Sequence, residues 1–473
     1  MPSILGANTL SGGYDVANSV RLTGTNDYFH KTPSSSGSQR KFSFSAWVKK
    51  TDSSTGVLFS SGEADGNPNL ALYFDSSDRI NMYSTQGMQY ITTRVFRDPN
   101  AWYHIMFVVG TASSNANNRQ QLYVNGVRET VFTTSTVIGQ NTDLSINTSD
   151  YRMAVGTGVD DEDYFGGYMA EVVFLDNQSL GPLSFGEFDE DSGIWKPIPI
   201  AGSAAIGGTN GFYLDFQASG NLGNDVFGGT DLTEVNLAAT DQSTDTCTNN
   251  FATFNPLIRN KSYNDGSLAE GNTYFAPDGR AIACSSIGVT SGKWYAEFKA
   301  TDAGALSIGV GDIQLGIQAI GQTNPIYYDN NPSYAIGYYN SNGNLSYNGT
   351  SASYGNSYTD NDIIGVALDM DNHAVYFSKN GTFQNSGDPT SGSSKTGDAT
   401  STASYNPLDD GGEMFMFVED FSASGVGQCY VNFGSPAYAI SSGNADADGH
   451  GNFEYAVPSG YFALCTKNLA ECG

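Results

Sequence analysis

The sequence predicts an all-β protein built of two β-sandwich modules joined by an extended connector. Three observations predict this. The chain is rich in Gly (56 residues) and aromatic residues (12 %) and poor in charged residues (15 %), which suits short strands and tight turns better than long helices. Strand-like runs form two separate series, each with an Asn-Gly pair, the strongest short-range hairpin signal. The length of 473 residues fits two or three domains.

The first series of strands is expected within residues 20–199, after a polar N-terminal arm over residues 1–19. Apolar residues alternate over residues 41–48, which is the period of a strand. Residues 102–109 are apolar at nearly every position, as in a central strand that is covered on both faces. The pair Asn125-Gly126 then predicts a hairpin, because both residues tolerate the positive φ of a type I′ turn.

The remaining segments complete the expected organisation. Residues 183–191 are expected to form the one clear helical turn of the first half. Residues 200–255 are expected to be an extended connector, rich in Gly, Asn, Asp and Thr over 222–250, in which residues 211–216 could form one strand. The second module with its C-terminal tail is expected over residues 256–473. Within it, two tight turns over residues 363–382 predict a three-stranded meander, and the low-complexity residues 387–404 predict a long exposed loop.

The charge balance excludes several partners. The formal charge is −28, from 21 basic and 49 acidic residues, so nucleic acid and anionic membranes would be repelled. No run of about 18 apolar residues is present, so membrane insertion is not expected. The first twenty residues have neither a basic nor an apolar segment of the secretory type, so no signal peptide is expected.

The five cysteines do not form a recognisable framework. Their number is odd and none are spaced as Cys-x-x-Cys, which argues against a zinc site and against a full set of disulfides. We expect mostly buried free thiols. Cys465 and Cys472 are close enough in sequence to leave a late oxidative bridge between them open.

Three stretches of the first half carry a family resemblance. They are FSFSAWVKK (42–50), WYHIMFVVGTASSNANNRQQLYVNGVRE (102–129) and YFGGYMAEVVFLDNQSL (164–180). In this order and spacing they resemble the concanavalin A-like, laminin-G-type jelly roll, over about residues 20–199. In that family a middle strand ends in a "lyvNG" hairpin and the final strand contains "f-G-x-i-a-e-v".

The second half resembles a SPRY domain, another jelly-roll β-sandwich. The residues that carry this resemblance are GKWYAEFKA (292–300), SIGVGD (307–312), IIGVALDMDNHAVYFSKNGT (363–382) and YVNFGSP (430–436). The N-terminal extension of the larger B30.2 form is not visible. In addition, TNNFATFNPL (248–257) and PSGYFALCTKNL (458–469) resemble segments of tailed-bacteriophage virion proteins that fuse such modules.

This last resemblance implies a virion protein, made in the host cytoplasm and released by lysis. As a fibre or spike it would contact a host surface glycan or receptor protein; as a head or tail decoration it would bind only other virion proteins. A homo-oligomer is expected, and a trimer if the protein is a fibre. A polysaccharide depolymerase is the third alternative.

An enzymatic role is not expected. Retaining glycosidases with the concanavalin-like sandwich place two carboxylates on one strand as Glu-x-Asp-x-Glu, about 5 Å apart. The acidic strings at residues 160–163 and 187–191 lack this spacing on an apolar strand. The four histidines are scattered, with no recognisable nucleophile beside them, and we interpret them as structural.

A calcium site is one candidate. Asp160, Asp161 and Asp163 could supply loop oxygens for Ca²⁺, a hard cation, and the laminin-G resemblance implies a calcium at about this edge of the sandwich. The alternative is a solvated acidic loop in a very acidic protein.

A tyrosine-rich stretch is the candidate recognition surface. Residues 326–358 contain eight of the 28 tyrosines among Asn, Ser and Gly, a mixture typical of antibody paratopes and suited to sugar binding. The ligand-binding candidates are Tyr327, Tyr328, Tyr338, Tyr339 and Tyr347. The alternative is that Tyr338, Tyr347 and their neighbour Tyr334 belong to the framework of the sheet.

Overall fold

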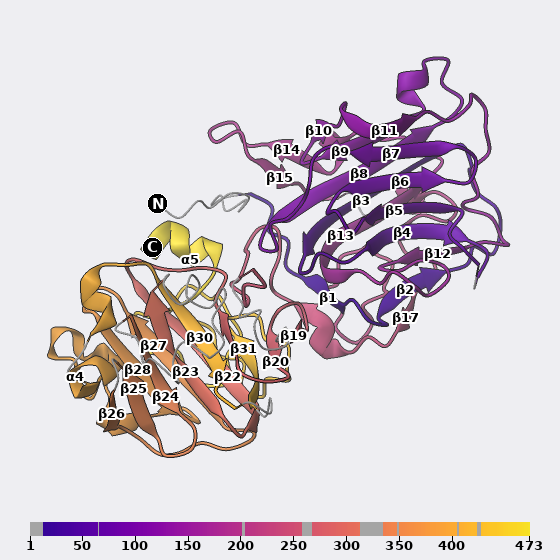
Figure 1. Ribbon diagram of the computed structural model, residues 1–473. Helices are drawn as coiled ribbons and strands as arrows, with labels where there is room; N and C mark the ends of the chain where they lie inside the picture. The colour runs from indigo at the N-terminus through magenta and orange to yellow at the C-terminus, as the bar shows by residue number, and fades with distance from the viewer. Residues whose placement is uncertain are drawn as a thin grey trace. The chain divides into compact units, whose positions relative to one another are not determined.

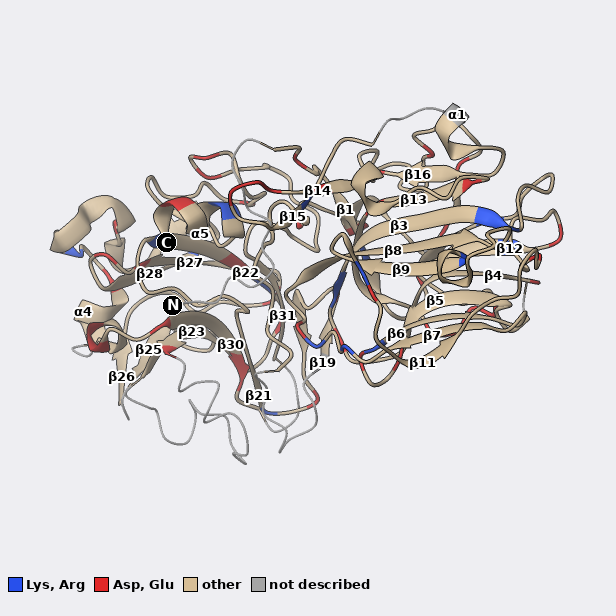
Figure 2. Cartoon of the chain, turned by 90° about the horizontal axis from the view of Figure 1, so that it is seen from above, with Lys and Arg blue, Asp and Glu red and all other residues tan. Residues whose placement is uncertain are grey.

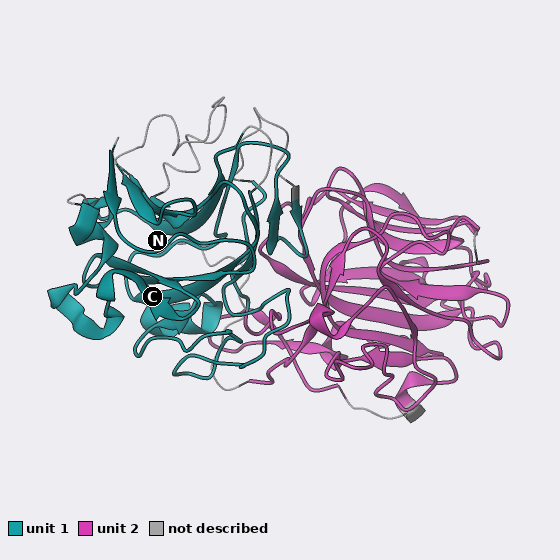
Figure 3. Ribbon diagram, turned by 90° about the horizontal axis from the view of Figure 1, so that it is seen from below, with its two compact units in different colours: residues 1–3, 250–473 teal, residues 4–249 magenta. Residues whose placement is uncertain are grey.

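The computed structural model describes residues 13–64, 66–200, 204–257, 267–312, 334–347, 350–403, 406–422 and 427–473 (Figure 1). The chain divides into two compact units, one ending at Asn249 and the other beginning at Asn250 (Figure 3). Each unit is a β-sandwich of two antiparallel sheets, so the predicted fold class is confirmed. Acidic residues lie on strands and loops of both units (Figure 2).

The first sandwich consists of two eight-stranded sheets. One sheet has the order β10 (Val127–Arg128), β9 (Gln120–Val124), β8 (Trp102–Gly110), β3 (Lys41–Lys50), β13 (Gly166–Asp176), β1 (Ser19–Thr23), β18 (Gln242–Ser243), with β16 (Phe212–Leu214) also paired to β13. The other has the order β11 (Phe132–Thr136), β7 (Met88–Thr92), β6 (Ile80–Ser84), β5 (Leu70–Phe74), β4 (Gly56–Gly62), β12 (Arg152–Val155), β2 (Tyr28–Lys31), β17 (Thr233–Val235). Short helical turns lie at Ala116–Asn118, Pro182–Ser184, α1 (Ala204–Gly207) and Ala239–Asp241.

Strand β8 shows why its sequence is apolar at nearly every position. Ile105 and Phe107 point into the core between the two sheets. Met106 and Val108 point to the opposite face, where they pack against the segments that follow β13. Both faces of this sheet are therefore covered, as the uninterrupted apolar run predicted.

The connector predicted over residues 200–255 is not extended chain. Strand β16 pairs with β13 in the register Val172↔Leu214, β17 pairs with β2, and β18 pairs with β1. Phe212 and Leu214 are fully buried in the first core. The prediction was wrong because the Gly and Asn residues form turns between very short strands, and a strand of three residues gives almost no periodicity.

The helical turn predicted over residues 183–191 is also corrected. Only Pro182–Ser184 makes a helical turn, and β14 (Gly186–Phe188) and β15 (Trp195–Pro197) form a hairpin. The rings of Phe188 and Trp195 meet edge to face at 4.9 Å across it. Asp189 closes the turn, because its Oδ1 accepts the backbone N–H of Ser192 at 2.9 Å. These cross-strand contacts outweigh the weak local preference for helix.

The second sandwich consists of an eight-stranded and a six-stranded sheet. The first has the order β19 (Ser267–Ala269), β20 (Tyr274–Ala276), β31 (Gly427–Asn432), β22 (Lys293–Ala303), β27 (Ile363–Asp369), β28 (Ala374–Lys379), β29 (Thr382–Phe383), with β32 (Phe462–Ala463) parallel to β22. The second has the order β21 (Ala281–Cys284), β30 (Met414–Asp420), β23 (Leu306–Asp312), β24 (Ala335–Tyr339), β25 (Asn344–Tyr347), β26 (Thr350–Ser353). The predicted meander is β27–β28–β29.

The stretch at residues 387–404 is not a long exposed loop. It contains the helical turn Pro389–Ser394 and the helix α4 (Ala399–Ala403), and it lies between the turns Gln384–Ser386 and Pro407–Asp410. Ala399 is fully buried and Ala403 is 2 % exposed, and both pack in the second core. Small side chains can approach the sheet closely, so a composition of low complexity is compatible with burial here.

The C-terminal helix α5 (Thr466–Cys472) decides the question of the cysteine bridge. Cys465 caps the helix and Cys472 is its last residue, and both thiols are free. With a rise of 1.5 Å per residue, the two ends are about 10 Å apart. Because a disulfide requires Cα atoms within about 7 Å, the bridge could form only if the helix unwound.

The helices of the described residues are all short. None of them combines the length and the apolar character that a membrane-crossing helix needs.

Candidate functional site

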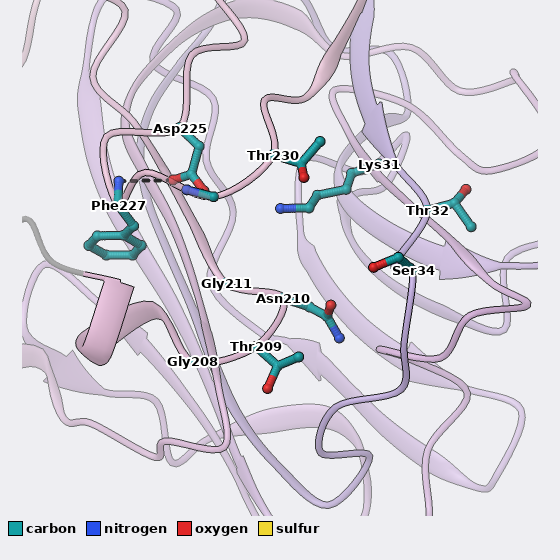
Figure 4. A pocket seen from close by; sticks show the side chains of 11 residues that line it. Lys31, Thr32, Ser34, Gly208, Thr209, Asn210, Gly211, Asp225, Phe227 and Thr230 are labelled. Atoms are coloured by element: carbon teal, nitrogen blue, oxygen red, sulfur yellow. Dashed lines mark hydrogen bonds between the residues drawn. The ribbon is translucent and has the colours of Figure 1, made fainter.

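A pocket of about 160 Å³ lies in the first sandwich, where β2 ends beside two loops of the segment after β13 (Figure 4). This volume is smaller than the ~300–1,000 Å³ of pockets for drug-sized ligands, so it suits a ligand of one ring. It is lined by Lys31, Thr32, Ser34, Gly208, Thr209, Asn210, Gly211, Asp225, Phe227, Gly229 and Thr230.

Asp225 organises one wall of the pocket. Its Oδ1 accepts the backbone N–H groups of Tyr213 at 2.9 Å and Phe227 at 3.0 Å, and its Oδ2 accepts that of Gly229 at 3.1 Å. A Cβ at Gly229 would lie 2.4 Å from this Oδ2, so glycine is required for the close approach. The carboxylate is 4 % exposed and fixed by the loop that carries it.

Lys31, the last residue of β2, is half-buried and extends into the pocket toward the side on which Asp225 lies (Figure 4). Burial lowers the pKa of this lysine, while the charges of Asp225 and Asp231 raise it. Within the described part of the chain, its ammonium has no hydrogen bond and no carboxylate within ion-pair distance. It is therefore available to a ligand.

Asn210 supplies an acceptor opposite the lysine. Its Nδ2 donates to the carbonyl of Ser35 at 2.9 Å and to Oδ1 of Asn147 at 2.6 Å, which fixes the amide. Its own Oδ1 accepts no hydrogen bond from the described residues, and Figure 4 shows this oxygen turned toward the pocket. The pocket thus presents an ammonium donor and carboxylate and amide acceptors, with threonine and serine hydroxyls at its rim.

His104 has a structural role. It is 1 % exposed, and burial lowers its pKa to about 3, so the ring is neutral. The indole Nε1–H of Trp195 donates to its Nδ1 at 3.1 Å, so the proton of the ring is on Nε2, which donates to Ser45 Oγ at 2.8 Å. The direction of this hydrogen bond is opposite to that in a catalytic pair, in which the histidine accepts the proton of the serine hydroxyl.

The three candidate calcium ligands are not assembled as a set. Asp161 forms an ion pair with Arg152, with 2.5 Å between its Oδ1 and Nη2. Asp163 is exposed overall, and partial desolvation of its carboxyl, together with the charge of the nearby Asp160, raises its pKa. No group of three or more His, Cys, Asp or Glu side chains that could hold a metal ion occurs among the residues described. The geometry of this loop therefore does not favour the predicted site.

The prediction of an exposed tyrosine-rich surface is wrong for two of its residues. Tyr338 is fully buried and stacks on Phe377 at 5.5 Å, and Tyr347 is 7 % exposed in the same core. Adjacent residues of strand β24 point to opposite faces of the sheet, and of the pair Tyr338 and Tyr339 it is Tyr338 that points into the core. Tyr339, on the opposite side, is half-buried and meets Phe421 edge to face at 5.1 Å. Tyr327 and Tyr328 lie outside the described residues.

Two buried glutamates with raised pKa values, Glu171 in the first sandwich and Glu297 in the second, were not predicted. Glu171 lies in a β-bulge of β13 with φ of 50°, and its Oε2 accepts the hydroxyl of Tyr213 at 2.8 Å. Glu297 accepts the backbone N–H groups of Glu454 and Tyr455 at 2.9 and 2.8 Å. Burial raises the pKa of each glutamate from 4.5 to about 7.

Both sandwiches are therefore expected to lose stability as pH rises. Below pH 4.5 folded and unfolded states both hold these protons; between pH 4.5 and about 7 only the folded state does, so stability falls through this window. The loss is up to about 3 kcal/mol for each glutamate at 1.36 kcal/mol per pH unit. Glu171→Gln should flatten the pH dependence of the first transition in calorimetry, while the exposed-site control Glu162→Gln should not. An unchanged slope in Glu171→Gln would show that this carboxyl is already ionised.

Two family models match the chain. A model of the concanavalin A-like lectin/glucanase superfamily matches residues 23–180, and the SPRY domain model matches residues 293–397. The chain therefore contains a concanavalin A-like, laminin-G-type lectin domain and a SPRY domain. Of the pocket, only Lys31, Thr32 and Ser34 fall within the lectin match. The loops that complete it follow the match, in the segment whose composition predicted a connector.

Several solved structures are similar to parts of the chain. The SPRY domain of human HERC1 is 20 % identical, with 38 % of this chain and 96 % of that domain covered and a TM-score of 0.28. A heptameric SAP-like pentraxin from Limulus polyphemus is 13 % identical, with 36 % and 80 % covered and a TM-score of 0.26. A proposed carbohydrate-binding protein from Bacteroides ovatus is 15 % identical, with 49 % and 65 % covered and a TM-score of 0.29. No curated protein matches the chain at a significant level.

Proposed function

We propose that this protein binds a glycan through the pocket of its lectin domain and acts by binding rather than by catalysis. The observation that supports this most directly is the pocket itself. It combines fixed acceptors at Asp225 and Asn210 with the free donor Lys31, in a volume that suits one sugar ring. Hydroxyl groups of a sugar both donate and accept, so they can satisfy both kinds of group at once.

Blocking the pocket tests this function. Thr230 is exposed at its rim, so Thr230→Tyr should fill the entrance without disturbing the core. Ser135→Tyr is the matched control, because it adds the same side chain on β11, at the opposite edge of the sheet from β17. On a panel of immobilised glycans, we expect the full chain and Ser135→Tyr to bind the same glycans and Thr230→Tyr to lose at least ten-fold in affinity. Equal binding by both variants, or no binding by the unaltered chain, would contradict the proposal.

We further propose that the protein is displayed on a bacteriophage virion as a fibre or spike, in contact with other virion proteins. Support comes from the resemblance of residues 248–257 and 458–469 to segments of tailed-phage virion proteins. Excess free chain should then slow adsorption of the phage to its host, while Thr230→Tyr should compete less well. A particle that contains the protein but adsorbs normally in the presence of free chain would indicate a decoration protein instead. Shortening of the glycan by the chain would indicate a depolymerase.

A further inference from the structure

We propose that the pocket selects an acidic sugar, and that the ammonium of Lys31 binds the carboxylate of that sugar. This inference rests on the proposed glycan binding and specifies its ligand class. It is carried by one feature of the first sandwich: a half-buried lysine with no carboxylate within ion-pair distance, where the other shielded lysines of the described residues each have one.

The other lysines of this sandwich provide the comparison. Lys49 pairs with Asp245 at 2.7 Å, Lys50 with Asp78 at 2.5 Å, and Lys196 with Asp189 at 3.2 Å. Lys41 is exposed and needs no partner. A charge that is partly removed from water is unfavourable unless it is paired. In the described part of this sandwich, Lys31 is the one lysine that is shielded from water yet has no carboxylate within ion-pair distance.

The nearest carboxylates do not take this role, because hydrogen bonds within the loop hold both of them beyond ion-pair distance from the lysine. Asp225 accepts three backbone N–H groups, as described above. Asp231 accepts the backbone N–H of Asp225 at 3.0 Å and Nδ2 of Asn221 at 2.9 Å. Neither lies within 4.0 Å of the lysine Nζ, the distance that defines an ion pair. An anion that enters the pocket would therefore form the contact that the protein itself leaves open.

The acceptors around the lysine limit the classes of ligand that fit the pocket. Asn210 Oδ1 and the carboxylate of Asp225 face the same space and require a ligand that also donates hydrogen bonds (Figure 4). A simple inorganic anion brings charge but has too few hydroxyl donors to satisfy both acceptors. A neutral sugar brings donors but leaves the ammonium unpaired. A uronic or sialic acid residue brings one carboxylate and several hydroxyls on a single ring, which matches both requirements.

The test compares matched sugars with the full chain by calorimetry. Methyl glucuronide and methyl galacturonide are compared with methyl glucoside and methyl galactoside, which differ by the carboxylate alone, and N-acetylneuraminic acid is added as a second acidic class. Charge-assisted hydrogen bonds contribute about 1.5–3 kcal/mol, so we expect at least one acidic sugar to bind roughly ten-fold or more tighter than its neutral or non-carboxylate counterpart. Lys31→Met should remove this preference, whereas Lys31→Arg and the exposed-site control Lys41→Met should keep it.

The outcomes separate the two proposals. If neutral sugars bind as tightly as acidic ones and Thr230→Tyr abolishes both, the pocket is a glycan site and the inference about acidic sugars is wrong. The same conclusion follows if Lys31→Met keeps its melting temperature and its preference. If no sugar binds, or if Thr230→Tyr has no effect, the proposed function fails and this inference fails with it.

Discussion

A chain that ends at residue 199 is expected to leave the first sandwich unfolded, whereas a chain that ends at residue 249 should fold. The segment between these ends supplies Phe212, Leu214, Phe216, Leu222 and Leu232, all buried in the first core. Burial of one such side chain contributes about 1.5–3 kcal/mol. Loss of five therefore removes roughly 7–15 kcal/mol, as much as the whole stability of a typical domain.

Circular dichroism and calorimetry of the two truncated chains check this expectation. The longer chain should show a cooperative thermal transition and the shorter chain should show none. A third chain that ends at residue 230 removes β17 and β18 but keeps β16, and it should fall between them. A cooperative transition in the chain of 199 residues would show that the later strands only cover a sandwich that is already complete.

Replacement of Asp245 by alanine is expected to destabilise the first sandwich strongly. Its Oδ2 accepts Nζ of Lys49 at 2.7 Å and its Oδ1 accepts Nε1 of Trp102 at 3.1 Å. Both side chains of the ion pair are at most 1 % exposed. Removing one partner of a buried pair leaves an uncompensated charge and costs about 3–5 kcal/mol. For a domain of this size that lowers the melting temperature by roughly 6–20 °C.

The exposed pair of Arg40 and Asp143 provides the control for this substitution. The two side chains are 45 % and 53 % exposed, and the Arg40 Nε lies 2.5 Å from the carboxylate. Exposed ion pairs contribute about 0–1 kcal/mol, so Asp143→Ala should shift the melting temperature by a few degrees at most. Similar shifts for Asp143→Ala and Asp245→Ala would mean that water reaches Lys49. In the double variant Lys49→Met, Asp245→Ala, which removes both charges, much of the stability should return.

The prediction from sequence succeeded where a pattern was long and local. The strands β3 and β8 each extend over nine residues or more, so their apolar patterns are long enough to be distinguished from chance. Asn125 and Gly126 both adopt positive φ, 47° and 75°, as the predicted hairpin requires. Both sandwiches could therefore be predicted without a structure. Tyr338 and Tyr339 show the limit of this reasoning, since alternation requires one ring of the pair to point inward but does not say which.

The sequence by itself determined the fold class of this protein, because strand periods and Asn-Gly turns specify two β-sandwiches. Only the tertiary structure decided that residues 212–243 complete the first sandwich and close a pocket around Lys31. The physical reason is that the proposed role of the pocket depends on a lysine with no carboxylate within ion-pair distance. Whether a lysine has a counter-ion depends on residues about 200 positions away along the chain, and no local pattern records that separation. Lys49 has such a partner in Asp245, and Lys31 has none among the described residues.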